Sequence, residues 1–174
     1  MHYTGIGSRA TPPEIRQLMV DIARTFAGYG LILRSGGATG ADESFEQGCD
    51  SVNGPKEISL PWSGFNNRRA ANGVFNTISD EAIDMAAEFH PAWERCTIGA
   101  QRLHARNCYQ VLGRDLKTPS ALVVCWTRHA QGGGGTGQAL RIAKAWKIPV
   151  FDLADPAALT LLDQYVTPLI TGRP

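Results

Sequence analysis

Residues 31–49, LILRSGGATGADESFEQGC, decide the fold. The apolar residues 31–33 predict a short strand, and the small residues 35–40 predict a tight turn. Residues 41–47 predict a helix with carboxylates in its first turn, where they suit the positive end of the helix dipole. A strand that turns through glycines into a helix leaves backbone N–H groups without partners. The stretch therefore predicts a phosphate cradle and a nucleotide-like ligand.

A second glycine-rich turn strengthens this interpretation. Glycines are common at any sharp turn, and GGATG matches neither the GxGxxG fingerprint nor the GxxxxGK[ST] loop. However, residues 132–137, GGGGTG, follow the most strand-like segment of the chain, 120–126. They precede a helix that we expect to run to residue 146, with Thr136 as its N-cap. The alternative for this turn is a surface loop without a ligand.

Composition limits the classes of protein to consider. The chain has 174 residues, so we expect one domain over residues 1–174, large enough for a sizeable core. The net charge of +1 provides no global attraction to nucleic acid or membrane. The four cysteines form no CxxC pair, which favours reduced thiols and a cytoplasmic protein. The sequence shows no secretory signal and no apolar run of about 18 residues.

The order of elements predicts a parallel sheet. Residues 3–6 and 31–33 are strand-like, and an amphipathic helix lies between them, with Thr11 as its N-cap and Pro12 in its first turn. Alternation of strands and helices is typical of sheets covered by helices. The fold class is thus predicted as α/β, a Rossmann-like three-layer sandwich with a mainly parallel sheet of about five strands. The remaining expected strands are 57–62, 120–126 and 149–153, and the remaining expected helices are 79–89, 92–116 with a break at 97–99, and 155–165.

The residues that follow each predicted strand form the candidate site. Ligands of open parallel sheets bind at the carboxyl ends of the strands. Backbone donors and a guanidinium suit phosphate oxygens, and Trp62 could stack on a base. The alternatives are that Arg9 pairs with a surface carboxylate and that Trp62 packs in the core. The expected ligand-binding residues are Gly7, Ser8, Arg9, Ser35, Gly36, Gly37, Thr39, Gly40, Trp62, Gly133, Gly134, Gly135 and Thr136.

Three motifs together resemble the SLOG superfamily of Rossmann-like proteins. They are GSR at 7–9, SGGATGADESFEQG at 35–48 and GGGGTGQAL at 132–140. The superfamily includes DprA, YspA-like and lonely-guy-related proteins, and the Arg106-Asn107 pair resembles the RN pair of the YspA-like branch. The resemblance implies a nucleoside phosphate or ADP-ribose-like ligand, with Arg106 and Asn107 completing the pocket. It implies no required cofactor, and a homodimer is compatible with it.

One branch-specific motif is incomplete. Lonely-guy enzymes carry PGGxGTxxE, whose glutamate assists cleavage of an N-glycosidic bond. Here Gln131 replaces the proline, and Ala139 stands at the position of the glutamate. Because cleavage builds up positive charge on the sugar, a carboxylate is the natural group to assist it. The candidates from other directions are Asp42, Glu43 and Glu94.

A metal site is not predicted. His104 and Cys108 lie four residues apart on one expected helix, and His90 and Cys96 are near in sequence. Zinc accepts such ligands, but their spacing matches no common template. Packing is the simpler interpretation.

Three function classes follow. The first is a binding or sensor module for a phosphorylated nucleotide-derived ligand. The second is a nucleotide hydrolase or phosphoribohydrolase-type enzyme, and the third is a DprA-like protein that binds single-stranded DNA. The near-zero net charge does not favour an extended track for phosphates.

Overall fold

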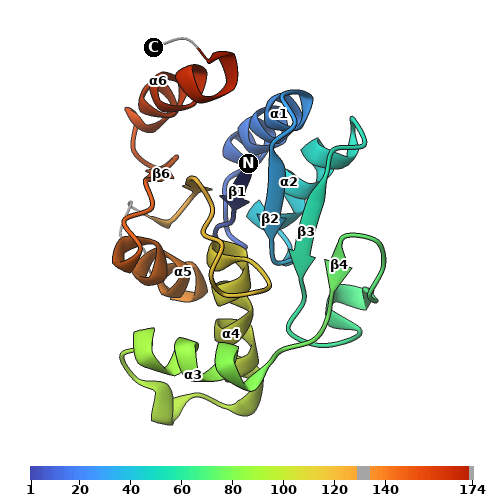
Figure 1. Ribbon diagram of the computed structural model, residues 1–174, viewed down its shortest axis with the longest axis vertical. Helices are drawn as coiled ribbons and strands as arrows, with labels where there is room; N and C mark the ends of the chain where they lie inside the picture. Colours follow the sequence, from blue (N-terminus) through green and yellow to red (C-terminus); the bar gives the residue numbers. More distant parts are fainter. Residues whose placement is uncertain (129–133, 173–174) are drawn as a thin grey trace.

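A six-stranded sheet organises the computed structural model, which describes residues 1–128 and 134–172 (Figure 1). The order of the strands is β4-β3-β2-β1-β5-β6, and each neighbouring pair is parallel. The strands are β1 (His2–Gly5), β2 (Ile32–Ser35), β3 (Lys56–Ser59), β4 (Val74–Phe75), β5 (Val123–Cys125) and β6 (Val150–Asp152).

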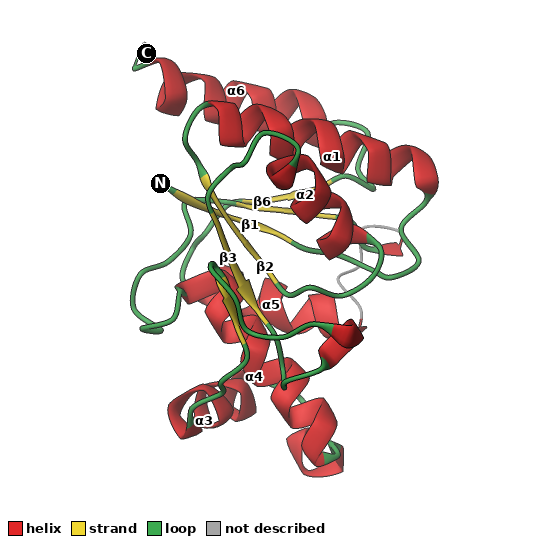
Figure 2. Cartoon of the chain, turned by 90° about the vertical axis from the view of Figure 1, so that its right-hand side faces the viewer, coloured by secondary structure: helices red, strands yellow, loops and turns green. Residues whose placement is uncertain are grey.

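Helices cover both faces of the sheet (Figure 2). One layer contains α1, α2 and α6, and the other contains α3, α4 and α5. None of the helices in the described ranges combines the length and the apolar character needed to cross a membrane. The helices are α1 (Pro13–Gly28), α2 (Ala41–Asp50), α3 (Asp80–Phe89), α4 (Ile98–Leu112), α5 (Gly134–Ala145) and α6 (Ala158–Thr171), with short 3-10 turns η1 (Phe65–Asn67) and η2 (Trp93–Arg95).

The central strands are buried on both faces, which explains their continuous apolar sequences. Val124 of β5 packs into the layer of α1, α2 and α6, whereas Val123 and Cys125 pack into the opposite layer. Tyr3 of β1 meets the ring of Phe26 edge-on, with 4.9 Å between the ring centroids. Alternate residues of one strand thus contribute to two separate cores.

The predicted fold class is confirmed, with six parallel strands where about five were expected. The additional strand, β4, has only two residues, and the two-residue length gives it no readable pattern in the sequence. Ser79, the first residue of the expected helix 79–89, is the N-cap of α3, since its side chain accepts from the Ala82 amide. Helix α6 continues to Thr171, beyond the expected end at residue 165.

The predicted start of the first helix is wrong by one residue. Helix α1 begins at Pro13, and Pro12 precedes it without a capping side chain. The hydroxyl of Thr11 instead donates to the Ser8 carbonyl at 2.7 Å. Thr11 therefore stabilises the loop that follows β1 and does not cap the helix.

The strand order reverses at β1. The chain proceeds from β1 to β2, β3 and β4 on one side, then crosses to β5 and β6 on the other. The carboxyl ends of β1 and β5 therefore diverge into separate loops. In open parallel sheets such a switch point is where a crevice forms for a ligand.

Candidate functional site

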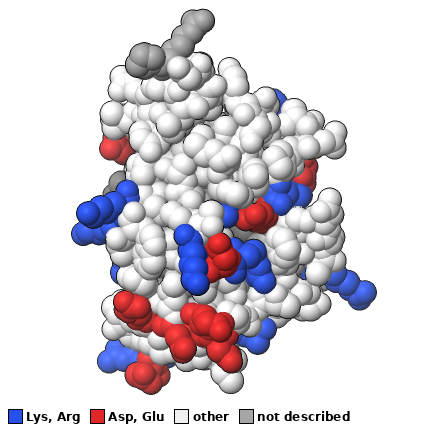
Figure 3. Space-filling model, viewed as in Figure 1, with Lys and Arg blue, Asp and Glu red and all other residues white. Residues whose placement is uncertain are grey.

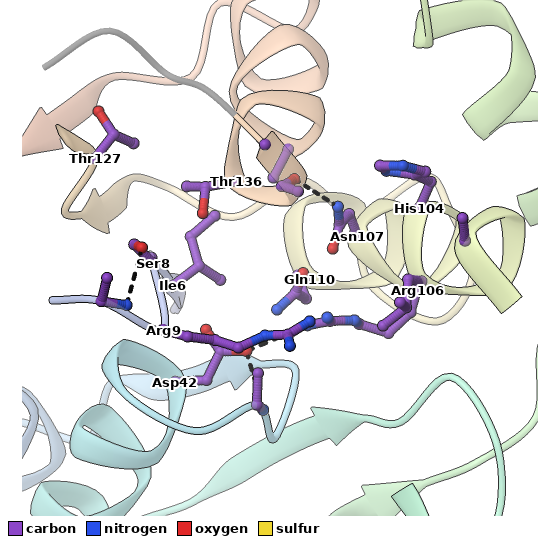
Figure 4. Close-up of a pocket in the computed structure, with 18 of the residues that line it drawn as sticks. Ile6, Ser8, Arg9, Asp42, His104, Arg106, Asn107, Gln110, Thr127 and Thr136 are labelled. Carbon is purple, nitrogen blue, oxygen red and sulfur yellow. Dashed lines mark hydrogen bonds and ion pairs between the residues drawn. The ribbon is translucent and has the colours of Figure 1, made fainter. Parts of the chain in front are cut away.

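A cavity of about 650 Å³ lies at this switch point (Figure 4). Its size is in the range of small-molecule sites. The loops after β1 and β5 meet the first turns of α2 and α5 and one face of α4 around it. The described residues that line it are Ile6, Gly7, Ser8, Arg9, Ala10, Ala38, Asp42, Phe65, Ala100, Leu103, His104, Arg106, Asn107, Gln110, Thr127, Arg128, Gly134, Gly135, Thr136 and Ala139.

The loop after β1 forms one wall of the cavity. The Ser8 amide donates to the Trp126 carbonyl at 3.1 Å, which joins this loop to the end of β5. A Cβ atom at Gly7 would lie 2.7 Å from the Ala41 Cβ, so glycine is required for α2 to approach so closely. The exposed Arg9 side chain lies across the cavity toward Arg106 (Figure 4).

A buried ion pair forms part of the cavity wall. Arg106 Nη1 lies 3.2 Å from Asp42 Oδ2, and both side chains are almost fully buried. Burial raises the pKa of Asp42, although Arg106 opposes this shift. Burial also lowers the pKa of Arg106, and the positive charge of Arg9 acts in the same direction. Arg106 Nε is buried without a hydrogen-bond partner among the described residues.

Gln110 links the ion pair to the first glycine turn. With its amide oriented toward its neighbours, its oxygen accepts from the Gly36 amide and from Arg106 Nη1, each at 2.9 Å. Its nitrogen donates to Asn107 Oδ1 at 2.8 Å. A Cβ atom at Gly36 would lie 1.4 Å from Arg106 Nη1. The glycine therefore provides the space that the guanidinium occupies.

The first turns of α2 and α5 differ in charge. The carboxylate of Asp42 lies in the first turn of α2 and accepts from the Ala38 amide at 3.3 Å. The first turn of α5 has no acidic residue, and Gly134, Gly135 and Thr136 all line the cavity. Asn107 Nδ2 donates to the Gly135 carbonyl at 2.9 Å and fixes this turn. The positive end of α5 therefore faces the cavity without a carboxylate of its own.

The structure brings many of the expected ligand-binding residues together. One expected ligand-binding residue, Gly133, lies outside the described residues. These expected residues line the cavity: Gly7, Ser8, Arg9, Arg106, Asn107, Gly134, Gly135 and Thr136. Thr136 is the third residue of α5, so the expectation that it precedes the helix as N-cap is wrong.

The first glycine turn, which includes the expected residues Ser35, Gly36, Gly37, Thr39 and Gly40, packs closely against neighbouring segments. Of residues 35–40, Ala38 lines the cavity. The Ser35 hydroxyl is buried and donates to the Gly5 carbonyl at 2.6 Å. A Cβ atom at Gly37 would lie 2.7 Å from Arg68 Nη1, and one at Gly40 would lie 2.8 Å from the Arg9 backbone. These glycines permit close packing of neighbouring segments.

Trp62 and two of the candidate carboxylates lie outside the cavity lining. The Trp62 ring meets Phe65 edge-on, with 5.3 Å between the centroids, and Phe65 is the ring that lines the cavity. Glu43 is exposed and lies 3.6 Å from Arg16, and Glu94 is exposed in η2. Asp42 is the one candidate carboxylate in the lining.

Sequence reasoning did not place Gln110, Thr127, Arg128 or His104 at the ligand site. Thr127 and Arg128 directly follow β5, so the rule about strand ends could have found them. His104 and Gln110 share a helix with Arg106 and Asn107, and helical spacing could have suggested them. Burial lowers the pKa of His104 to about 4, with further contributions from neighbouring His90, Arg141 and Arg106.

The cavity carries an excess of positive charge. Three arginines line it among the described residues, Arg9, Arg106 and Arg128, against one carboxylate, Asp42. Apolar groups from Ile6, Phe65 and Leu103 form other parts of the wall. The arrangement suits a ligand with an anionic group and an apolar or planar part.

Comparison with known proteins identifies the fold. No family model and no curated protein matches the sequence. The structure is similar to that of DNA processing protein A from Helicobacter pylori, described for its unique single-stranded DNA binding mode, with a TM-score of 0.61 and 20% identity over 99% of this chain and 79% of that chain. It is also similar to the Moco carrier protein of Chlamydomonas rheinhardtii, with a TM-score of 0.50 and 20% identity over 94% and 84% of the two chains. The chain thus shares its fold with both of these proteins.

Proposed function

We propose that the cavity binds a phosphorylated nucleotide-derived ligand, a nucleoside phosphate or an ADP-ribose-like molecule, and that the protein is a binding or sensor module. The observation that carries this proposal is the first turn of α5, which lines a positively charged cavity without an acidic residue. The amino end of a helix favours phosphate through its amides and its dipole.

Arginine side chains complete the anion site in this proposal. Arg9 and Arg128 are exposed at the cavity, where their guanidinium groups can pair with phosphate oxygens. Arg106 already pairs with Asp42, so its role is to hold the wall of the cavity. Phe65 and Leu103 provide an apolar surface for the base or the sugar.

The carboxylates of the cavity support a role in binding better than a role in cleaving an N-glycosidic bond. Ala139 lines the cavity at the position where the related hydrolase motif has its glutamate. The remaining lining carboxylate among the described residues, Asp42, already accepts from Arg106 and from the Ala38 amide. The positive charge that develops on the sugar during cleavage would thus lack a free carboxylate to stabilise it.

A small ligand is also a better fit than a DNA strand. Single-stranded DNA is bound by one of the proteins that share this fold, but an extended strand needs a track of positive charge. The charge of Arg68 is already paired within the protein, because Arg68 donates to Glu46 through both terminal nitrogens, at 2.6 and 2.5 Å. On the face shown in Figure 3, lysines and arginines alternate with carboxylates, and acidic side chains gather at the lower end, where α3 lies.

Calorimetric titration with AMP, ADP-ribose and oligo(dT) tests this proposal. We expect AMP or ADP-ribose to bind, and Arg9→Ala to weaken binding by about 10-fold or more, as loss of a hydrogen bond to a charged group predicts. Arg24→Ala, which removes an exposed arginine of α1 paired with Asp21, is the matched control and keeps the wild-type affinity.

Other outcomes reject parts of the proposal. Release of free base or ribose phosphate during the titration, abolished by Asp42→Asn, would make the protein a hydrolase. Tight, salt-sensitive binding of oligo(dT) without binding of AMP or ADP-ribose would identify a DNA-binding protein instead.

A further inference from the structure

Three side chains with metal-binding chemistry meet beside the cavity. His90 directly follows α3, Cys96 follows η2, and His104 lies on α4. One nitrogen from each histidine and the Cys96 sulfur all lie within 4.8 Å of one another. The sequence indicates these three residues, together with Cys108, as candidate zinc ligands, but their spacing, with five residues between the first pair and seven between the second, matches no common template.

The geometry of this His–Cys–His cluster is close to that of a ligand set. Cys96 Sγ lies 3.8 Å from each ring nitrogen of His90. The rings of His90 and His104 have centroids 4.4 Å apart and planes inclined at 47°. All three residues are half-buried, so they are partly shielded from water while an ion could still enter.

The polar atoms of the cluster are poorly satisfied by the protein itself. His104 Nδ1 is buried and has no hydrogen-bond partner among the described residues. A buried nitrogen without a partner is unfavourable. Apart from its contacts with His90, Cys96 Sγ has a long contact of 3.8 Å with the Ala92 carbonyl. A metal ion bound by one nitrogen of His104 and by Cys96 Sγ would give the two residues a common partner.

We propose that His90, Cys96 and His104 bind a Zn²⁺ ion. Imidazole nitrogens and a thiolate are ligands that zinc prefers, and three protein ligands leave a fourth tetrahedral position for water. The Ala92 amide donates to His90 Nδ1 at 3.2 Å, and an ion bound at this nitrogen replaces that hydrogen bond. This proposal does not depend on nucleotide binding at the cavity.

The thiolate is the essential ligand in this set. Arg106 and Arg141 act on His104 with positive charge, which opposes binding of a cation. Cys96 supplies the negative charge that offsets them. Cys108, one turn beyond His104, is not part of the site, because its buried sulfur points to the Ala82 carbonyl at 3.7 Å.

Metal analysis of the full chain tests the proposal. The protein is stripped with a chelator, loaded with Zn²⁺ and passed through gel filtration, and the zinc that co-elutes is measured by mass spectrometry. We expect one equivalent of zinc for the wild type. Cys96→Ser and His104→Ala should lower the affinity by at least the roughly 10–100-fold that loss of a supporting residue alone costs. The matched control is His2→Gln, which replaces a histidine of β1 that pairs with Glu57 of β3. We expect this variant to retain the metal.

A second measurement guards against misfolded variants. Loading with Co²⁺ should give a thiolate charge-transfer band in the wild type and in His2→Gln, and no such band in Cys96→Ser. Zn²⁺ should also raise the melting temperature of the wild type, because it binds the folded state. No retained zinc in the wild type would overturn the proposal. A Co²⁺ spectrum without a thiolate band, or zinc binding that survives in Cys96→Ser with normal folding, would do so as well.

Discussion

At the scale of single residues, the cavity depends on the position of Arg106. The guanidinium contacts Asp42 and Gln110, and it occupies the space that the missing side chain of Gly36 leaves free. A buried charge pair contributes little net stability, but removing one partner leaves an uncompensated buried charge. The neighbours of Arg106 therefore fit its guanidinium in both shape and charge.

Gly36→Ala should move Arg106 and destabilise the protein. The new Cβ would lie 1.4 Å from Arg106 Nη1 and 2.5 Å from Gln110, so one of them must shift. Overpacking of this kind costs about 1–3 kcal/mol, measurable by urea unfolding. Gly28→Ala is the control, because a Cβ there has no neighbour within 4 Å. Equal stability of the two variants would contradict the assigned packing.

Glu46 gives the molecule a predictable sensitivity to acid. Burial alone would raise the pKa of Glu46, but hydrogen bonds from Arg68 and Lys56 outweigh it and lower the pKa. A lowered pKa in the folded state stabilises the fold above the unfolded value of about 4.3, and this contribution is lost as the pH falls further.

Glu46→Gln should therefore lower the free energy of unfolding by about 1–2 kcal/mol at pH 7, through weaker hydrogen bonds to Arg68 and Lys56. The difference in the free energy of unfolding between this variant and the wild type should shrink as the pH is lowered from 5 to about 3. Chemical denaturation at each pH measures this difference. Glu88→Gln, an exposed carboxylate of α3, is the control. A gap between Glu46→Gln and the wild type that stays constant over this range would show that the charge of Glu46 does not act through these partners.

At the scale of elements, the two helices that start at glycine turns have opposite roles. Helix α2 places its own carboxylate, Asp42, at its amino end, and this carboxylate accepts from the Ala38 amide. Helix α5 has Gly134, Gly135 and Thr136 there and no acid. Similar sequences thus produce one turn that pairs with a carboxylate of its own helix and one turn that is available to an anion.

Thr136→Glu should abolish binding of AMP or ADP-ribose while leaving the fold intact. The new carboxylate would occupy the amino end of α5 as Asp42 does in α2, and it would repel phosphate. Stability should stay equal or rise by about 0.3–1 kcal/mol, because acidic side chains suit this end of a helix. Thr160→Glu changes the same third position of α6 and is the matched control. Unchanged affinity in Thr136→Glu would show that the ligand binds elsewhere.

The sequence predicted these elements better than it predicted their surroundings. Apolar periodicity and glycine turns located five of the six strands, since these signals are local. Whether a turn stays open depends on side chains from distant segments. Gln110 and Arg106 of α4 close the turn at Gly36 from more than 60 positions away, and no local pattern reports this. For the same reason the sequence indicates the members of the His–Cys–His cluster as candidate zinc ligands but does not show that they meet.

At the scale of the whole molecule, the strand order determines where a ligand can bind. The reversal at β1 separates the loops after β1 and β5, and the cavity lies between them. The alternation of strands and helices predicted a parallel sheet. The rule that ligands bind at the carboxyl ends of the strands predicted that Arg9 and residues 134–136 lie together, and all of them line the cavity. Two proteins with 20% identity share this architecture, which shows that the fold tolerates wide changes in sequence.

The most direct test is an NMR titration of the ¹⁵N-labelled protein with ADP-ribose, following the backbone amides of both glycine turns. The largest shifts are expected at Gly134, Gly135 and Thr136, with little change at Gly36, Gly37 and Gly40. Shifts concentrated at Gly36, Gly37 and Gly40, or no shifts at either turn with ADP-ribose and with AMP, would contradict the proposed anion site at α5.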